Sequence, residues 1–88
     1  MFNIVEIKDL KNEIGDLVKA LRKQRGWSQT QLANTLGVSR TTIQNLELGK
    51  NFTVDTILKV LKEMDLLKQL QSEITQAKDH VLHAKSMY

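Results

Sequence analysis

Residues 27–50 read WSQTQLANTLGVSRTTIQNLELGK, and this stretch decides the fold. It holds two short segments of apolar periodicity separated by Gly37, which suits a turn conformation that side chains oppose. Ser28, followed three residues later by glutamine, forms a capping box and predicts the start of a helix. Ser39 predicts the cap of a second helix, over residues 40–48. The stretch therefore predicts two short helices joined by a turn.

The second of these helices is predicted to have a buried face and a polar face. Val38, Ile43 and Leu46 are spaced to hold it from below, and Ala33 is small where the first helix should cross it. The outer face then carries five polar residues: Ser39, Arg40, Thr41, Gln44 and Asn45. Arginine and asparagine side chains can read guanine and adenine through paired hydrogen bonds.

Another helix is predicted before this pair. Its apolar residues recur at helical spacing: Leu10, Ile14, Leu17, Val18 and Leu21. We expect Asp9 to cap this helix and Gly26 to follow its end. Gly15 lies inside the helix and weakens it by about 1 kcal/mol relative to alanine. Residues 2–7 alternate loosely in hydrophobicity, which predicts a short strand or an extended arm.

Two further helices are predicted after the pair. Gly49 should end the helix at residues 40–48, and Thr53 should cap a fourth helix over residues 54–64. Beyond Leu66, apolar residues alternate at spacings of three and four, which gives a seven-residue repeat. This seam consists of Leu67, Leu70, Ile74, Ala77, Val81, Ala84 and Tyr88. So narrow a stripe favours helix pairing in a dimer, although folding back on the chain's own first helix is the alternative.

The composition limits the class of protein. A chain of 88 residues with 26% charged side chains is typical of one small globular domain. The absence of cysteine excludes a disulfide framework and a thiolate metal site, and it fits a reducing cytoplasm. We find no apolar run of membrane-spanning length and no secretory signal pattern at the start. We therefore expect a single domain in the cytoplasm, without a membrane partner.

The positive charge is concentrated in one part of the chain. Residues 19–50 carry six basic side chains and one acidic side chain, whereas the rest carries seven basic and nine acidic ones. Such a concentration favours a surface for a polyanion. An ordinary solvated surface is the alternative reading of the same charges.

The sequence offers little for catalysis or for a cofactor. His80 and His83 have a spacing that can bind zinc, but no third ligand is evident. No nucleophile with a base, paired carboxylates or phosphate-binding glycine loop appears. We therefore expect no enzyme activity, no metal and no cofactor.

The central stretch resembles the Cro/cI-type helix-turn-helix family, also called the XRE family. The residues that match its spacing are Gln29, Leu32, Ala33, Gly37, Val38, Ser39, Ile43, Glu47 and Gly49. The resemblance covers about residues 14–66 and implies an all-α, lambda-repressor-like domain of four to five helices. We divide the chain into an N-terminal arm at residues 1–8, a helix-turn-helix domain at residues 9–66, and an extended C-terminal helix at residues 67–88.

The resemblance also implies roles for single residues. The helix at residues 40–48 would enter the major groove of double-stranded DNA. Base reading is then expected of Ser39, Arg40, Thr41, Gln44 and Asn45. Phosphate binding is expected of Ser28, Gln29, Lys50 and Asn51. An internal ion pair is expected between Arg22 and Glu47, because a partly buried charge needs a partner.

Some of these residues have a purely structural reading. Ser28 and Ser39 could serve only as helix caps, and Gln44 could be part of a solvated surface. Trp27 is expected to pack against the domain rather than to stack on bases.

The function expected from the resemblance is transcriptional repression by a homodimer on a palindromic operator, since one reading helix covers few base pairs. The dimer interface is expected at Leu67, Leu70, Ile74, Ala77, Val81 and Ala84, with the arm at residues 2–7 as a second candidate. Residues 51–67 are similar to the HipB-like antitoxin branch of the family, which implies a toxin protein as another partner. A third hypothesis, a protein-interaction domain without DNA binding, fits poorly with Gln29, Arg40, Asn45 and Lys50.

Overall fold

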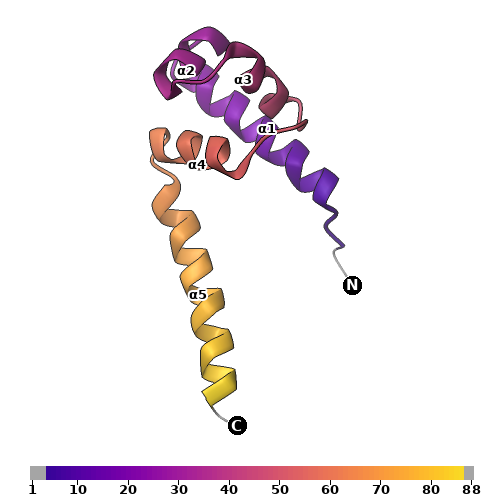
Figure 1. The fold of residues 1–88 in the computed structure, drawn as a ribbon, viewed down its shortest axis with the longest axis vertical. Coiled ribbons are helices and arrows are strands. Elements are labelled where there is room, and N and C mark those ends of the chain that lie inside the picture. The colour runs from indigo at the N-terminus through magenta and orange to yellow at the C-terminus, as the bar shows by residue number, and fades with distance from the viewer. Residues whose placement is uncertain (1–3, 87–88) are drawn as a thin grey trace.

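The computed structural model describes residues 4–86, and within them the chain forms five helices and no strand (Figure 1). In chain order these are α1 (Ile7–Gln24), α2 (Gln29–Leu36), α3 (Arg40–Glu47), α4 (Val54–Glu63) and α5 (Leu67–Ser86). The first four helices pack together into a compact unit, which we call the head, and α5 extends away from it. The predicted all-α class with an extended C-terminal helix is confirmed.

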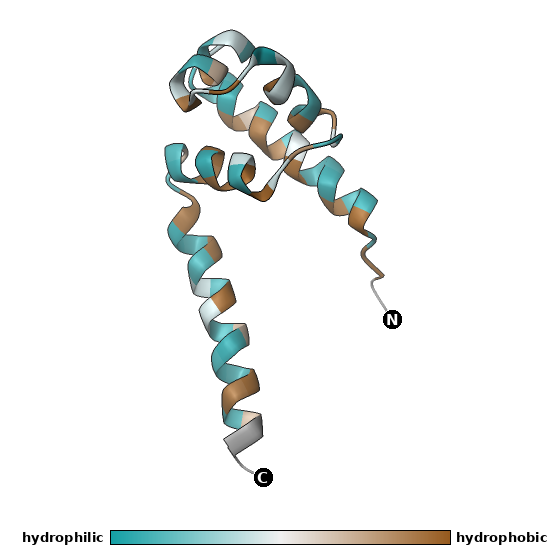
Figure 2. Cartoon of the chain, in the orientation of Figure 1, coloured by the Kyte–Doolittle hydropathy of each residue, from teal (hydrophilic) through white to brown (hydrophobic). Residues whose placement is uncertain are grey.

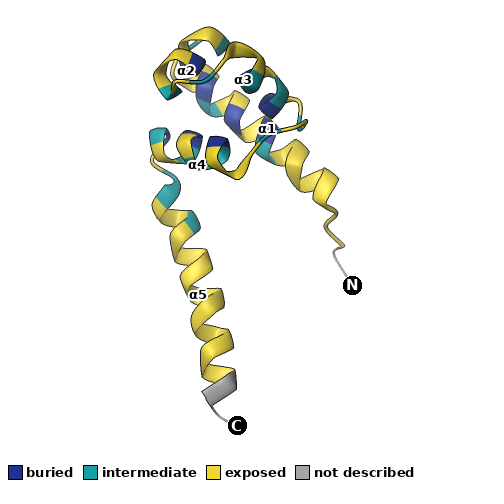
Figure 3. Ribbon diagram, viewed as in Figure 1, coloured by how far each residue is buried: buried dark blue, intermediate teal, exposed yellow. Residues whose placement is uncertain are grey.

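The core of the head is a small apolar cluster that all four of its helices share. Its buried members are Val18, Leu32, Ala33, Ile43, Leu46, Val60 and Met64. Figure 3 shows these buried positions on the facing sides of the helices, with exposed residues outside. Each fully buried leucine, isoleucine or valine side chain contributes about 1.5–3 kcal/mol relative to an exposed one. Burial of this cluster is therefore what holds α3 in place.

The crossing of α1 and α3 depends on Gly15. A Cβ atom at this residue would lie 2.6 Å from the carbonyl oxygen of Glu47 and 2.7 Å from that of Leu46. No side chain fits there without moving one of the two helices. The sequence predicted only that Gly15 weakens its helix, whereas the structure shows that it permits the close approach of α1 and α3.

Side-chain caps begin α2, α3 and α4 as predicted. The capping box is confirmed, because Ser28 Oγ accepts from the Gln31 N–H at 3.1 Å and Gln31 Oε1 accepts from the Ser28 N–H at 2.7 Å. Ser39 and Thr53 each accept from the backbone N–H three residues later, at 3.1 and 3.2 Å. Between α2 and α3, Gly37 has the left-handed φ of 71°, which explains why a glycine suits this turn.

The predicted start of the first helix was wrong. The helix already begins at Ile7, and Glu6 is its N-cap residue without a side-chain cap hydrogen bond. The Leu10 N–H donates to the Glu6 carbonyl at 3.1 Å, and this hydrogen bond closes the first turn of α1. Asp9 lies in that first turn, where its negative charge suits the helix dipole. The helix therefore runs across the boundary that we expected between residues 8 and 9.

The alternative of an N-terminal strand is not found in the described residues. Residues 4–6 have irregular backbone and Ile7 is already helical, so no strand forms there. Phe2, from the predicted arm, and Tyr88, from the predicted seam, lie outside the described residues.

The last helix, α5, packs on α4 only near its start. Leu67 and Leu70 are half-buried, whereas every residue over 71–84 is exposed (Figure 3). Hydrophobic positions nevertheless recur along its length (Figure 2). In particular, 58% of Ile74 and 62% of Val81 are exposed. The seam is therefore not folded back on α1, and it remains uncovered along most of α5.

Candidate nucleic-acid interface

The exposed face of α3 carries most of the predicted base-reading residues. Arg40, Thr41 and Gln44 are exposed, while Ile43 and Leu46 on the opposite side are fully buried. The buried side fixes the helix, so the exposed side chains start from defined backbone positions. This combination of an anchored helix and free polar side chains is what reading base edges in a major groove requires.

Two of the predicted reading residues are partly engaged within the head. Ser39 Oγ accepts from the Thr42 N–H and lies 2.8 Å from Thr42 Oγ1, so it acts as the cap of α3. Asn45 is half-buried, and its backbone carbonyl accepts from the Lys50 N–H at 2.8 Å. Ser39 is still exposed, whereas Asn45 is less exposed than Arg40, Thr41 and Gln44.

A buried ion pair joins α1 to the end of α3. Arg22 Nε and Glu47 Oε2 are 2.6 Å apart, and Arg22 Nη2 donates to Glu47 Oε1 at 3.0 Å. This is the ion pair expected from the resemblance, and both residues are only 8% exposed. Arg22 Nη1 also donates to the Trp27 carbonyl at 2.8 Å, which fixes the chain just before α2. The guanidinium therefore ties together α1, α3 and the approach to α2.

The charge of Arg22 is stabilised by its partner. Hydrogen bonding to Glu47 raises the pKa of Arg22 above its ordinary value. Burial lowers this pKa, and the charge attraction of Glu47 raises it further, so the net change is upward. The buried guanidinium therefore keeps its charge beside the Glu47 carboxylate.

The start of α2 is held by the same carboxylate. Gln29 Nε2 donates to Glu47 Oε1 at 3.1 Å, so the side chain of Gln29 is half-buried against the ion pair. The first turn of α2 contains no acidic residue, and Ser28 already caps the Gln31 N–H. Backbone N–H groups at a helix start attract anions.

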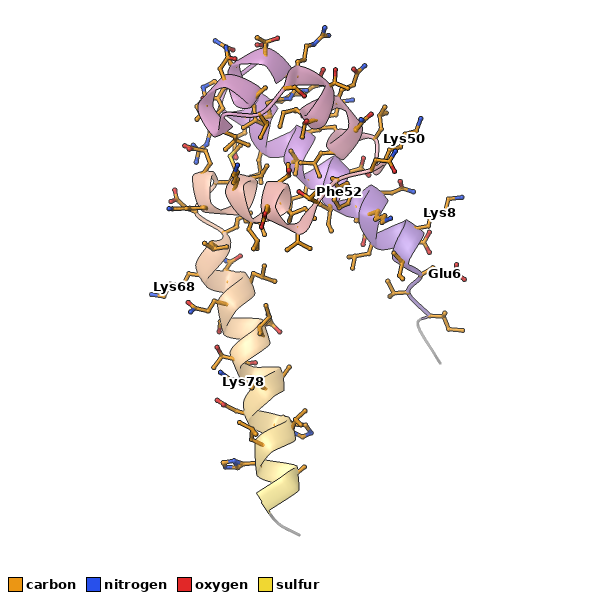
Figure 4. The ribbon with its side chains drawn as sticks, in the orientation of Figure 1. Glu6, Lys8, Lys50, Phe52, Lys68 and Lys78 are labelled. Atoms are coloured by element: carbon orange, nitrogen blue, oxygen red, sulfur yellow. The ribbon has the colours of Figure 1, made fainter. Side chains whose placement is uncertain are left out.

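The loop after α3 supplies one outward basic side chain. Lys50 is exposed and points away from the head, whereas Phe52 in the same loop is half-buried against the core (Figure 4). Lys11 Nζ lies 6.0 Å from the centre of the Phe52 ring. Asn51 has a positive φ of 23°, a conformation that asparagine tolerates better than most residues. Phe52 therefore anchors the loop that carries Lys50 and Asn51.

In the structure, only some of the basic side chains of residues 19–50 remain available to attract a polyanion. Arg22 is neutralised by Glu47, and Arg25 lies 3.7 Å from Glu63 and 3.8 Å from Asp65. The Arg25 guanidinium also stacks 5.4 Å from the centre of the Trp27 ring, and that ring packs against the core as expected. Exposed basic side chains without these partners remain within the same stretch: Lys19, Lys23, Arg40 and Lys50.

Sequence reasoning missed two contacts that shape this face. The hydrogen bond between Gln29 and Glu47 joins residues 18 positions apart, and no local pattern marks it. The contact of Gly15 with the backbone of α3 also escaped prediction, although a glycine inside an apolar-periodic helix is a signal of close packing.

The described chain, residues 4–86, contains no cluster of three or more histidine, cysteine, aspartate or glutamate side chains that could hold a metal ion. Within the same residues, none of the helices combines the length and the hydrophobicity needed to cross a membrane.

The sequence of the chain has counterparts among known proteins. A family model described as helix-turn-helix matches residues 18–67, which is more than half of the chain. The chain is 34% identical over 55 residues to the antitoxin HipB of Escherichia coli strain K12, covering 61% of this chain and 62% of that protein. It is 43% identical over 49 residues to the competence pilus inhibition repressor of Acinetobacter baylyi, covering 56% of this chain and 44% of that repressor. The chain thus spans less than two thirds of the length of these relatives.

Proposed function

The chain belongs to the Cro/cI-type helix-turn-helix family, and we propose that it is a sequence-specific DNA-binding repressor of transcription. The observation that carries this proposal is the anchored α3, whose buried side is fixed while Arg40, Thr41 and Gln44 face outward. The protein acts by binding rather than by catalysis. We infer that it acts in the cytoplasm.

Within this proposal, α3 lies in the major groove with its N-terminal half toward the bases. Arg40 and Gln44 are the principal readers, because both are exposed and both offer paired hydrogen bonds to a base edge. Thr41 adds an exposed hydroxyl and methyl group beside them. Ser39 and Asn45 contribute at the edge of the same surface, since each is partly engaged within the head.

Phosphate contacts flank the reading helix. Gln29 stands at the start of α2 with its side chain steadied by Glu47, and Ser28 lies beside it. On the other side, Lys50 and Asn51 are exposed in the loop after α3. Such contacts orient the protein on the duplex without carrying sequence information.

The repressor works as a homodimer through the seam of α5. The seam is uncovered in the single chain, as the exposure of Ile74 and Val81 shows. Burial of these side chains against a second copy supplies the missing contacts, and two reading helices cover two half-sites. The interface comprises Leu67, Leu70, Ile74, Ala77, Val81 and Ala84.

Fluorescence anisotropy on DNA from the chain's own promoter region, against scrambled DNA and across salt, tests the proposal. We expect tighter binding to the promoter that persists as salt rises. Arg40→Ala should cost about 1–3 kcal/mol on the promoter and relax the preference at one base pair. Lys50→Ala should weaken binding to all sequences and lower the salt slope by about one.

The matched control for both variants is Lys8→Ala, because Lys8 is exposed on the first turn of α1, away from α3 (Figure 4). It removes the same charge and should leave affinity and preference nearly unchanged. Equal, salt-sensitive binding of the parent chain to both DNAs would contradict sequence-specific repression and leave only a basic surface.

A second candidate function, an antitoxin that also represses its operon, is favoured by the similarity to the antitoxin HipB. The head offers a surface for a protein partner that lies outside the α3 face. An apolar groove runs between α1, α4 and the start of α5, lined among others by Leu10, Leu17, Ile57, Leu61 and Leu70. Half of Leu10 and 44% of Leu17 remain exposed there.

The antitoxin function is tested with the product of the gene that lies next to this one. Co-expression should suppress toxicity of that product and yield a purified complex. Leu10→Ser with Leu17→Ser should weaken the complex but not operator binding. A neighbouring product that is harmless and does not bind the chain would contradict this function and leave the repressor proposal intact.

A further inference from the structure

The residue types along the seam of α5 specify how two copies would pair. In heptad notation, the a positions of the seam are Leu67, Ile74 and Val81. The d positions are Leu70, Ala77 and Ala84. Within parallel coiled coils, β-branched residues at a with leucine at d favour two strands over three or four. Two of the three a residues are β-branched, and the leucine at d lies at the end of α5 nearest the head.

The charged residues beside the seam agree with this arrangement. Glu73 takes the g position that precedes Ile74, and Lys78 takes the e position of the next heptad. In a parallel pair, a g residue of one helix lies opposite that e residue of the other. Both side chains are exposed, and within the described chain neither forms an ion pair. A second copy would therefore bring opposite charges together twice, once on each side of the seam.

The direction of α5 in the molecule gives an independent reason. α2 and α3 lie at one end of the long axis, and α5 runs to the other end (Figure 1). A parallel pair places both heads at the same end, so that both α3 helices can meet one side of a duplex. An antiparallel pair would place the two heads at opposite ends. Reading a palindrome requires the first arrangement, so this step rests on the proposed function.

We propose that α5 binds a second copy of this chain in parallel and in register, with Glu73 of each copy opposite Lys78 of the other. The contact is strongest near the head, where Leu58 of α4 shares an apolar groove with Leu67, Leu70 and Ile74. It weakens toward the free end, because Ala77 and Ala84 bury little surface. The dimer is consequently short and dissociates on dilution.

The antiparallel alternative has one feature in its favour and two against it. It would pair large residues with small ones, placing Leu67 on Ala84, Leu70 on Val81 and Ile74 on Ala77. It would also place the heads at opposite ends and bring Glu73 to His80 instead of Lys78. The two arrangements therefore differ in which charged residues lie opposite each other. They also differ in whether a seam residue lies next to the same residue of the second chain.

Charge reversal tests which charges meet. Glu73→Lys and Lys78→Glu should each weaken self-association by roughly five- to tenfold in sedimentation equilibrium, since two exposed pairs become repulsive. An equimolar mixture should form heterodimers in preference to either homodimer, because both contacts become attractive again. Asp79→Lys is the matched control on the outward side of α5 and should change neither behaviour. A mixture without preference for the heterodimer would overturn the proposed register.

Cysteine cross-linking tests which residues approach each other, and the natural chain contains no cysteine to interfere. Ala84→Cys should oxidise to a covalent dimer in the parallel pair, because the two residues face each other. In the antiparallel pair they would lie about 25 Å apart along the helices. There, a mixture of Ala84→Cys with Leu67→Cys would cross-link while neither variant did so alone, and that result would overturn the proposal. Circular dichroism of each variant shows that α5 stays folded.

The outcomes separate this inference from the proposed function. A dimer in sedimentation that binds the promoter selectively but fails to cross-link through Ala84→Cys refutes the parallel pairing and keeps the repressor. Efficient cross-linking through Ala84→Cys, with no preference for promoter DNA, keeps the pairing and refutes the repressor. A chain that is monomeric at every concentration refutes the pairing outright.

Discussion

The head and α5 differ in how much of their structure is determined within the single chain. In the head, Leu32, Ile43, Leu46 and Val60 are completely buried, and a buried ion pair crosses between helices. In α5, every residue over 71–84 is exposed, including apolar ones. The α1–α4 unit thus contains its own stabilising contacts, whereas within the described residues 4–86 the seam of α5 is uncovered beyond Leu70.

The comparison shows that a regular hydrophobic pattern does not by itself reveal what covers it. Both regions have apolar residues at helical spacing, yet only the head packs them against its own helices. Most of the stability of a helix in a protein comes from packing of its apolar face, and α5 lacks such packing along most of its length. Mutations that act through internal contacts should therefore affect the head strongly and α5 weakly.

The largest effect is expected from Glu47→Ala. The change leaves Arg22 as a buried charge without its partner, which costs about 3–5 kcal/mol of unfolding free energy. Urea denaturation followed by circular dichroism measures this loss. The double variant Arg22→Met with Glu47→Leu should recover most of it, since no unpaired charge is then buried. A loss below 1 kcal/mol for Glu47→Ala would mean that the pair matters little to the head.

A smaller loss is expected from Gly15→Ala. The added methyl group collides with the backbone of α3, and overpacking of this kind costs about 1–3 kcal/mol even against the gain in helix propensity. Thermal unfolding provides the measurement. Lys19→Ala, at an exposed position of the same helix, is the control and should not lower the melting temperature. An equal or higher melting temperature for Gly15→Ala would show that α1 and α3 can separate without cost.

The smallest effect on the head is expected from the combined change Ile74→Asp and Val81→Asp. Both side chains are exposed in the single chain, so the unfolding free energy of the head should change by less than about 0.5 kcal/mol. The dimer should nevertheless be lost in sedimentation velocity, because two charges would enter each seam. An intact dimer would place the interface elsewhere on the molecule, and a destabilised head would show that α5 supports it.

Local features made most of the fold predictable. Caps such as Ser28 and Ser39 lie next to the backbone groups that they bind, and the turn at Gly37 needs a conformation that few other residues adopt. The start of α1 was misplaced because no side-chain cap marks it and the helix simply continues to Ile7. Sequence alone therefore located four of the helix starts well and one poorly.

Contacts between distant residues limited the prediction of the candidate site. The exposed face of α3 followed from its periodicity, but the hold of Glu47 on Gln29 depends on how three helices meet. For the same reason, Gly15 could be recognised as a helix weakness but not as the place where two backbones touch. The narrow stripe of α5 favoured a seam that stays uncovered in the single chain, but the pattern alone left folding back on α1 open.

The shared carboxylate of Glu47 has a consequence for the thermodynamics of recognition. It accepts hydrogen bonds from Arg22 of α1 and from Gln29 of α2 while belonging to α3. The three helices are therefore fixed relative to one another in the free chain, so the proposed association with DNA would cost little conformational entropy. We expect the encounter rate to be set mainly by diffusion and charge, and the lifetime on an operator to be the quantity that differs between DNA sequences.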